Sequence, residues 1–287
     1  MRNFILSAEA ACDLSPELAE KYDVSVMPMK YSVDGEQYSS DDGKLSTHEM
    51  CEKMIAGAKT STTQPNPAEV EEYLENLLAQ GKDVLHLSFS SAQSGTCLNF
   101  KNVAEKLNAT SKNKVYVVDT LCQSAGVGLL LSLLAEKTDA ENLTAEQARD
   151  FAEETKLHIL HYCAVDTFTF LARGGRIPAY LAAIGNLIKL KPIIHLDNAG
   201  KLVAVKKLIG RKRAIEELIK NFKETYDQKS DLVYISQSDC SEDAEYIKTE
   251  IEKFAPKARV TILPLGPIMV AHNGPGTIAV YYTADKR

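Results

Sequence analysis

The sequence lacks several features that mark common functional classes. No apolar run approaches the length of a membrane span. No run of five or more lysines and arginines occurs, and the net charge of −6 disfavours nucleic acid as the main partner. No Gly-x-Gly-x-x-Gly follows a predicted strand, and no Gly-x(4)-Gly-Lys loop is present, so nucleotide binding has little support. We therefore expect a soluble protein whose ligand belongs to another class.

Cysteine is also sparse and irregularly placed. Six cysteines without regular spacing in a chain this long predict free thiols in a reducing compartment rather than a disulfide scaffold or a metal site. The first residues, 1–7, predict a β-strand rather than a signal peptide. We expect a cytoplasmic protein without a bound metal.

The chain is long enough for two domains. At 287 residues it exceeds the usual size of one domain. Residues 1–158 alternate strand and helix patterns, which predicts a mainly parallel α/β domain. Residues 159–287 predict a smaller α/β domain with a mixed sheet, containing a hairpin around Asn198-Ala199-Gly200 and an amphipathic helix over 178–190. The fold class is thus α/β with two domains.

Three polar segments are candidates for a binding site. His272 lies between two Gly/Pro turns, where we predict a connection between strands; it is either a ligand contact or a structural residue. Residues 60–67 and 90–96 are predicted loops rich in hydroxyls. Such loops before helices can seat an anion, because the first backbone N–H groups of a helix are unpaired. Ser94 or Thr96 alternatively caps the following helix and does nothing more.

These segments form part of an ordered set of five motifs. They are hydroxyl-Gln-Pro-x-Pro ending at Pro67, Ser-x-x-Ser-Gly-Thr ending at Thr96, Leu-Ala-Arg-Gly-Gly-Arg-Ile ending at Ile177, Lys-Pro-Ile ending at Ile193, and Gly-Pro-x(4)-His-x-Gly-Pro-Gly ending at Gly276. The set resembles the DegV family of bacterial fatty-acid-binding proteins, and the resemblance runs from about residue 3 to residue 283. Order and spacing together make the match specific.

The resemblance implies a DegV-like fold that holds one long-chain fatty acid, such as palmitate, stearate or oleate, between its domains. No other cofactor and no catalytic residue are implied. The tail would supply most of the affinity, at roughly 0.8 kcal/mol per buried CH₂. The expected ligand-binding residues are Thr62, Thr63, Ser94, Gly95, Thr96, Asp119, His272, Asn273 and Gly274.

Family members of this kind present the fatty acid carboxyl group to a partner kinase, which forms an acyl phosphate. The resemblance therefore implies that Arg173, Arg176 and Arg211 dock an acidic partner or the phosphates that it brings. A Gly-Gly-Arg turn is expected to expose the Arg176 guanidinium. The alternative is a solvated basic face without a partner.

The sequence departs from the family pattern near predicted strand ends. Glu9-Ala10 stands where the family usually has Asp-Ser. Cys97 replaces a common aromatic residue, and Cys12, Cys97 and Cys122 all fall in predicted strand-end loops. They either line one site or pack as small buried apolar residues. These differences concern the identity of the ligand more than the fold.

Two other functions compete with a lipid carrier. One is a regulatory protein that binds its partner without any lipid. The other is a hydrolase using Ser94 and His272, which would need these side chains within hydrogen-bond reach and an acid to orient the imidazole. Ser94 lacks the Gly-x-Ser-x-Gly elbow of many hydrolases.

Overall fold

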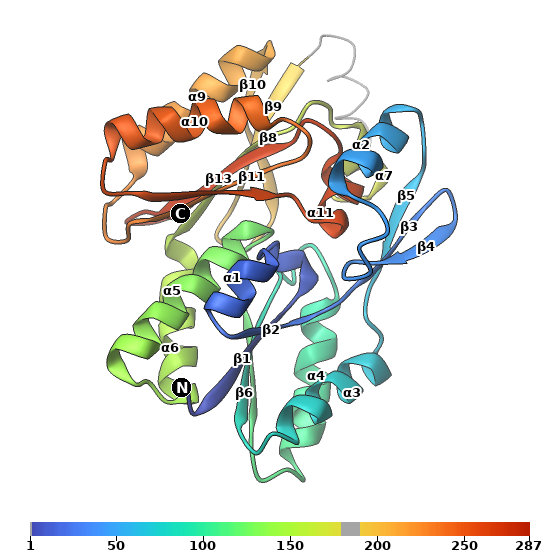
Figure 1. Cartoon of the computed structure of the whole chain (residues 1–287), viewed down its shortest axis with the longest axis vertical. Coiled ribbons are helices and arrows are strands. Elements are labelled where there is room, and N and C mark those ends of the chain that lie inside the picture. Colours follow the sequence, from blue (N-terminus) through green and yellow to red (C-terminus); the bar gives the residue numbers. More distant parts are fainter. Residues whose placement is uncertain (1, 179–189) are drawn as a thin grey trace.

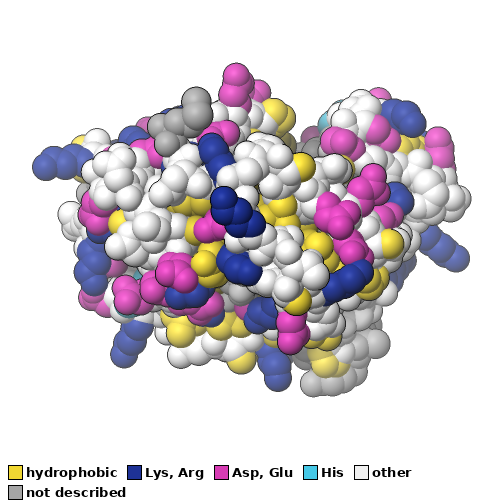
Figure 2. Space-filling model, turned by 90° about the horizontal axis from the view of Figure 1, so that it is seen from below, with side chains coloured by type: hydrophobic (Ala, Val, Ile, Leu, Met, Phe, Trp, Pro, Cys, Tyr) yellow, Lys and Arg dark blue, Asp and Glu magenta, His cyan; other side chains and the backbone are white. Residues whose placement is uncertain are grey.

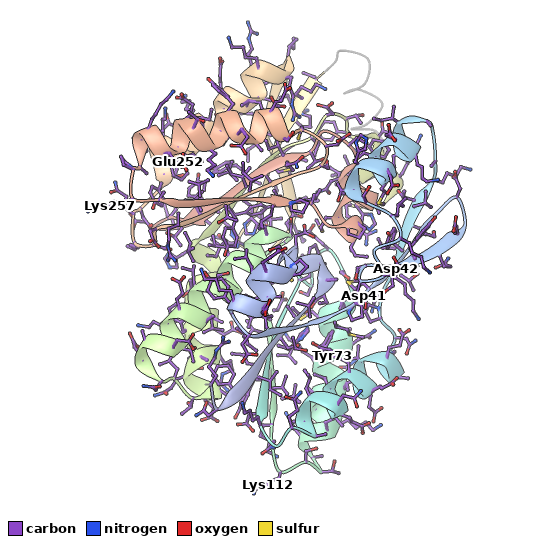
Figure 3. The ribbon with its side chains drawn as sticks, viewed as in Figure 1. Asp41, Asp42, Tyr73, Lys112, Glu252 and Lys257 are labelled. Atoms are coloured by element: carbon purple, nitrogen blue, oxygen red, sulfur yellow. The ribbon has the colours of Figure 1, made fainter. Side chains whose placement is uncertain are left out.

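The computed structural model describes residues 2–178 and 190–287, which form three sheets and their helices. Figure 1 shows two lobes, with the N-terminal residues in one and the last strands in the other. Figure 3 places Lys112 and Glu252 in different lobes, far apart along the molecule. The predicted helix over 178–190 lies almost wholly outside the described residues.

A four-stranded parallel sheet with the order β2-β1-β6-β7 forms the first lobe. Its strands are β1 (Phe4–Glu9), β2 (Val24–Met27), β6 (Asp83–Ser88) and β7 (Val115–Asp119). The strands are rich in buried residues because helices cover both faces, as the alternating pattern predicts. The surrounding helices are η1 (Ala10–Cys12), α1 (Pro16–Lys21), α3 (Pro67–Leu78), α4 (Thr96–Asn108), α5 (Ala125–Glu141), α6 (Ala145–Thr155) and η2 (Lys156–His158).

A separate antiparallel sheet interrupts this wound unit. Its strands are β3 (Lys30–Val33), β4 (Glu36–Ser39) and β5 (Thr60–Thr63), in the order β4-β3-β5. Helix α2 (Thr47–Ile55) lies between β4 and β5 in the chain. The prediction that residues 60–63 form a loop was wrong. Their β-branched threonines pair with β3 as an edge strand, Thr62 opposite Tyr31. Asp41 and Asp42, labelled in Figure 3, follow β4 at the edge of this sheet.

The second lobe contains a mixed six-stranded sheet in the order β10-β9-β8-β13-β11-β12. Its neighbours are antiparallel except β11 and β12, and the predicted hairpin is confirmed as the β9–β10 pair. Its elements are β8 (Ile159–Ala164), α7 (Thr169–Arg173), β9 (Leu190–Leu196), β10 (Leu202–Ile209), α9 (Arg211–Thr225), β11 (Leu232–Gln237), α10 (Ser241–Phe254), β12 (Arg259–Pro264), α11 (Pro267–Asn273) and β13 (Ile278–Thr283).

Helix α5 lies between the two larger sheets (Figure 1). Its first eleven residues, 125–135, are apolar on all sides apart from Ser132, and its leucines share one core with Leu6 and Leu85 of the parallel sheet and with Tyr234 and Tyr281 of the mixed sheet. A helix that is hydrophobic around its whole circumference has to be buried on every side. On the outer face of the mixed sheet, α9 and α10 cover a second core. We propose the boundary of the two domains at 158/159, where β8 begins.

The surface carries charges of both signs. Figure 2 shows Lys and Arg interspersed with Asp and Glu over the face that it presents, without a large region of one sign. Within residues 2–178 and 190–287, the structure contains no helix with the length and apolarity that crossing a membrane requires.

Candidate functional site

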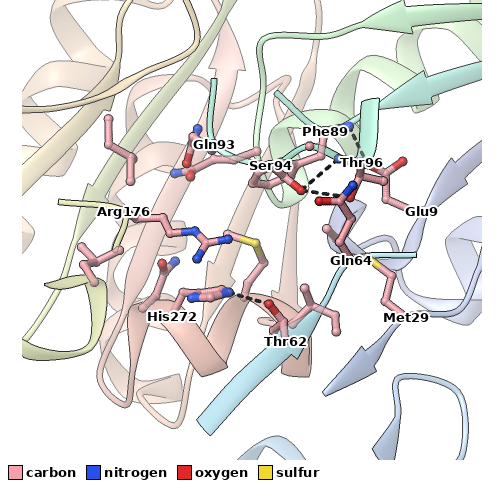
Figure 4. A pocket seen from close by; sticks show the side chains of 18 residues that line it. Glu9, Met29, Thr62, Gln64, Phe89, Gln93, Ser94, Thr96, Arg176 and His272 are labelled. Carbon is pink, nitrogen blue, oxygen red and sulfur yellow. Dashed lines mark hydrogen bonds between the residues drawn. The ribbon is translucent and has the colours of Figure 1, made fainter. Parts of the chain in front are cut away.

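A cavity of about 320 Å³ lies where the three sheets approach one another. Its lining comes from the carboxyl end of β1, from β5, from the loop before α4, and from α7, β10 and α11 of the second lobe. Figure 4 shows this lining from close by. The lining residues are Glu9, Ala11, Met29, Thr62, Gln64, Phe89, Gln93, Ser94, Gly95, Thr96, Gln123, Leu171, Arg176, Leu202, Ile268, Met269, His272 and Asn273.

Strand β5 directs two threonines toward helix α11. Successive strand residues point to opposite faces, and burial alternates along β5: Thr60 and Thr62 are partly buried whereas Ser61 and Thr63 are exposed. The Thr60 hydroxyl donates to the carbonyl of Ala271 at 2.8 Å. Thr62 Oγ1 lies 2.8 Å from His272 Nε2. The edge strand therefore ties the first lobe to the helix that carries the histidine.

His272 lies in the short helix α11 and not on a turn-rich connection between strands, which corrects the prediction. Pro267 at its first position and Gly274 just beyond its end bound this helix, and the flanking Gly/Pro residues concealed it in the sequence. Burial, with a smaller effect from the Arg176 guanidinium, lowers the pKa of His272 to about 4. The imidazole is thus neutral at pH 7.

The neutral imidazole has one N–H, and its surroundings indicate where it lies. His272 Nδ1 is buried without a partner among the described residues. A Cβ at Gly174 would come within 2.4 Å of this atom, so a glycine is needed there. An unpaired buried N–H costs more than an unpaired acceptor, so we assign the proton to Nε2, which donates to Thr62. The Thr62 hydroxyl is then free to donate into the cavity.

Ser94 belongs to the loop that joins β6 to α4. Its hydroxyl lies 2.9 Å from Thr96 Oγ1 and accepts a bond from the Thr96 backbone N–H at 3.3 Å. Gly95 is the N-cap residue of α4 and makes no side-chain cap. The loop is steadied from the second lobe, because Ser90 Oγ and Gln93 Nε2 both donate to the carbonyl of Gly200. Ser94 thus combines a local turn contact with a position on the cavity wall (Figure 4).

The structure brings together most of the predicted ligand-binding residues. Thr62, Ser94, Gly95, Thr96, His272 and Asn273 all line the cavity. The other three lie outside its lining. Thr63 points to the opposite face of β5, Asp119 accepts bonds from the backbone N–H groups of Ser91 and Leu121, and Gly274 ends α11 with a positive φ of 82°. Asp119 therefore supports the Ser94 loop from behind.

The three predicted docking arginines have different surroundings. Arg173 is exposed at the end of α7. The prediction that Arg176 is exposed was wrong: its side chain is partly buried and lines the cavity on the same side as His272 (Figure 4). Arg211 pairs with Asp243 at 2.8 Å and Asp166 at 3.1 Å. These carboxylates offset a cation placed at the start of α9, where the helix dipole disfavours it.

Sequence reasoning missed Glu9 as a residue of the cavity. Its side chain is 1% exposed and closes the wall at the end of β1. Glu9 Oε1 accepts from the Phe89 backbone N–H at 2.7 Å and from the Ser88 hydroxyl at 3.1 Å. Its other oxygen lies 2.9 Å from His86 Nε2. The position at the carboxyl end of a parallel strand was the available signal, since ligands bind at that edge of such sheets.

Neither a thiol nor a metal site contributes to the cavity within the described residues. Cys12, Cys97 and Cys122 are buried and absent from the lining, and burial raises the pKa of the Cys12 thiol to about 12 and that of Cys97 to about 11. No group of three or more potential metal ligands occurs in residues 2–178 and 190–287. The three cysteines fit the interpretation as small packing residues.

The geometry gives no support to a Ser-His hydrolase. His272 Nε2 bonds to Thr62 rather than to Ser94, and the Ser94 hydroxyl is engaged with Thr96. No carboxylate among the described residues orients His272 Nδ1. A nucleophile of this kind needs a base within reach and a third group that fixes the base. What remains is a set of donors that converge on a cavity of mixed polarity.

Comparison with known proteins agrees with this architecture. The DegV domain-containing protein CPE0026 of Clostridium perfringens is 31% identical over 292 residues, covering 100% of this chain and 99% of its own. The solved structure "Fatty Acid Binding of a DegV family Protein from Thermus thermophilus" is 28% identical with a TM-score of 0.85, covering 99% of this chain and 100% of that one.

A more distant structure shares the same fold. The stearic acid-binding protein of Eubacterium ventriosum is 21% identical, with a TM-score of 0.85 over 97% of this chain and 98% of its own. The family model described as "Uncharacterised protein, DegV family" matches residues 6–285. With nearly the whole chain matched and with the polar motifs gathered around one cavity, the chain belongs to the DegV family.

Proposed function

We propose that this protein binds one long-chain fatty acid in the cavity between its lobes, that the Thr62 and Ser94 hydroxyls donate to its carboxylate, and that His272 orients the Thr62 hydroxyl. The observation that carries the proposal is the 2.8 Å contact between Thr62 and His272, which joins two lobes in one polar seat beside Ser94. The fatty acids bound by DegV relatives from Thermus thermophilus and Eubacterium ventriosum support this ligand class.

The seat suits a carboxylate on chemical grounds. Hydroxyl donors satisfy a carboxylate that leaves water, and Arg176 adds a cation on the same side of the cavity. Burial lowers the pKa of His272, and the negative charge of a bound carboxylate would oppose this effect by favouring the protonated imidazole. The apolar part of the lining, including Phe89, Ile268 and Met269, offers contacts for the tail.

Mass spectrometry of lipid extracted from the purified protein tests this proposal. We expect about one long-chain fatty acid per chain. Thr62→Val should lower retention about tenfold or more, because it removes a hydrogen bond to a charged group. Thr63→Val is the matched control, since this neighbour faces away from the cavity. Protein that carries no fatty acid and takes up none when it is added would contradict the proposal.

We further propose that the protein performs no chemistry on the fatty acid and presents it to a partner kinase for acyl-phosphate formation. Arg173 is the docking residue that the surroundings favour. It is exposed and lies with Lys59 on a second cavity of about 330 Å³ beside Gly174, whose backbone packs against His272. Two cations beside the carboxylate seat would attract an acidic partner or its phosphates.

Acyl-phosphate formation with a purified fatty acid kinase and ATP tests the partner. Arg173→Ala should leave lipid content unchanged and reduce the transfer rate, whereas Arg176→Ala should reduce both. Equal kinase binding by lipid-loaded and delipidated protein, with no acyl phosphate formed, would instead favour a lipid-independent regulator.

A further inference from the structure

The cavity has two chemically opposite sides. Figure 4 shows Arg176 and His272 on one side and Glu9 on the other, with Ser94 and Thr62 between them. Among the described residues that line the cavity, Arg176 and Glu9 are the only ones of the Arg, Lys, Asp and Glu types. The proposed function uses the cationic side and assigns no role to the buried carboxylate.

The Glu9 carboxylate is buried and held in one position by hydrogen bonds. Its two oxygens are held by the Phe89 backbone, Ser88 and His86, at 2.7, 3.1 and 2.9 Å. The Phe89 N–H and the Ser88 hydroxyl are donors, and the ionised carboxylate accepts both of them. Burial without such partners would be very costly, so the surroundings maintain this charge at the cavity wall.

His86 ties this carboxylate to the rest of the lobe. Its Nδ1 lies 2.9 Å from Ser7 Oγ, which lies 2.9 Å from the Tyr73 hydroxyl. Its ring also stacks on Phe100 of α4 with 3.6 Å between centroids. The Glu9 side chain is thus held at the carboxyl end of β6 by Ser88 and Phe89. His86 in turn packs on α4, the helix that follows the Ser94 loop. The carboxylate cannot swing away from the cavity without breaking this network.

We propose that Glu9 determines the direction in which an acyl ligand lies and selects acids with an uncharged tail. The inference rests on the proposed fatty acid binding. A carboxylate on the Glu9 side would meet a like charge in a poorly solvated space, whereas on the other side it meets Arg176 and hydroxyl donors. A ligand with carboxylates at both ends places one of them against Glu9, and the protein therefore discriminates against it.

Binding of matched sixteen-carbon ligands to delipidated protein tests this inference. The ligands are hexadecanoic acid, hexadecanedioic acid and the monomethyl ester of the diacid, which keeps the length but not the second charge. We expect the wild-type protein to bind the diacid at least tenfold more weakly than its monomethyl ester. Glu9→Gln removes the charge and should narrow this ratio about tenfold. Glu9→Asp keeps the charge and should preserve it.

The ratio separates selection from a merely structural role. If Glu9 only supports the Ser94 loop, Glu9→Gln weakens all three ligands by the same factor, and the unchanged ratio overturns the inference. If Glu9→Gln does not fold, the wild-type protein alone still tests the inference. Equal affinity for the diacid and its monomethyl ester would overturn the inference, whereas a preference for the monomethyl ester would support it. Failure of the wild-type protein to bind hexadecanoic acid would overturn the proposed function as well.

Discussion

Two of the contacts between the lobes, one at α5 and one at α11, differ in composition. At α5, leucines and tyrosines from both larger sheets form one continuous core in which Leu129, Leu130 and Leu131 are fully buried. At α11, the contact with β5 consists of polar bonds beside a cavity, and the adjoining core contains Met29, Met50, Met54 and Met269. Flexible methionines tolerate changes of shape that a leucine core does not. The α5 contact therefore holds the lobes together, and the α11 contact can include a cavity without separating them.

The largest effect is expected from a cavity in the α5 contact. Leu130→Ala should lower the free energy of unfolding by about 2–5 kcal/mol, because it removes buried methylenes from a core that cannot collapse freely. Urea unfolding followed by circular dichroism measures the loss. Leu133→Ala on the same helix is the control, since Leu133 is only partly buried and should cost less. Equal losses would show that α5 is not the rigid contact.

Asp13 lies where the two contacts join, and its charge should make stability depend on pH. Its carboxylate accepts from Ser124 beside α5 at 2.5 Å and from the Gly266 N–H beside α11 at 3.1 Å. Burial raises its pKa to about 7. Its contribution to stability is therefore fully present below about pH 4 and is lost as the pH rises through 7. Relative to wild type, Asp13→Asn should gain stability between pH 4 and 7, as urea titrations at several pH values would show.

His272 should act in the opposite direction within the same range. Because burial lowers its pKa to about 4, its contribution is present above about pH 6.5 and is lost as the pH falls through 4. His272→Gln should therefore lose less stability than wild type on acidification. A variant that follows the wild-type profile would show that the imidazole is less buried in solution than in the structure. The glutamine side chain does not titrate in this range, and its amide N–H can still donate to Thr62.

The smallest effect is expected in the methionine core. Met269→Leu conserves volume and should cost less than about 1.5 kcal/mol of stability. If the methionines adapt to the tail, this variant should narrow the range of acyl chain lengths that the protein retains, measured by mass spectrometry of a mixed fatty acid pool. An unchanged range would assign adaptability to other residues.

The sequence predicts the sheets better than the short elements around the cavity. Apolar strand patterns that alternate with helix patterns identify the parallel strands, and the turn residues Asn198-Ala199-Gly200 between two strand patterns identify the β9–β10 hairpin. By contrast, β5 has four hydroxyl residues and no apolar alternation, and α11 is enclosed by Gly and Pro. Strand β5 forms by pairing with β3, and it is held against α11 by bonds that span more than 200 residues of sequence. Local patterns carry no record of such contacts.

The site was predicted in the same uneven way. Hydroxyls and the histidine are recognisable by residue type and motif, and Thr62, Ser94 and His272 do meet at one cavity. Only the structure shows that Glu9 and Arg176 line the cavity. From sequence alone, a glutamate at a strand end and an arginine after two glycines are expected to be exposed to solvent. Which of two adjacent threonines faces inward also depends on the strand that the sequence concealed.

The burial of the first three turns of α5 by both larger sheets has a consequence for folding. During synthesis the residues up to 158 emerge first, yet this helix finds its second cover only in β8, β11 and β13. Strand β13 pairs between β8 and β11, so the mixed sheet cannot close until residues 278–283 are available. An isolated fragment 1–158 would leave leucine-rich surface exposed and should aggregate. The two lobes, although separate in shape, have to become native together.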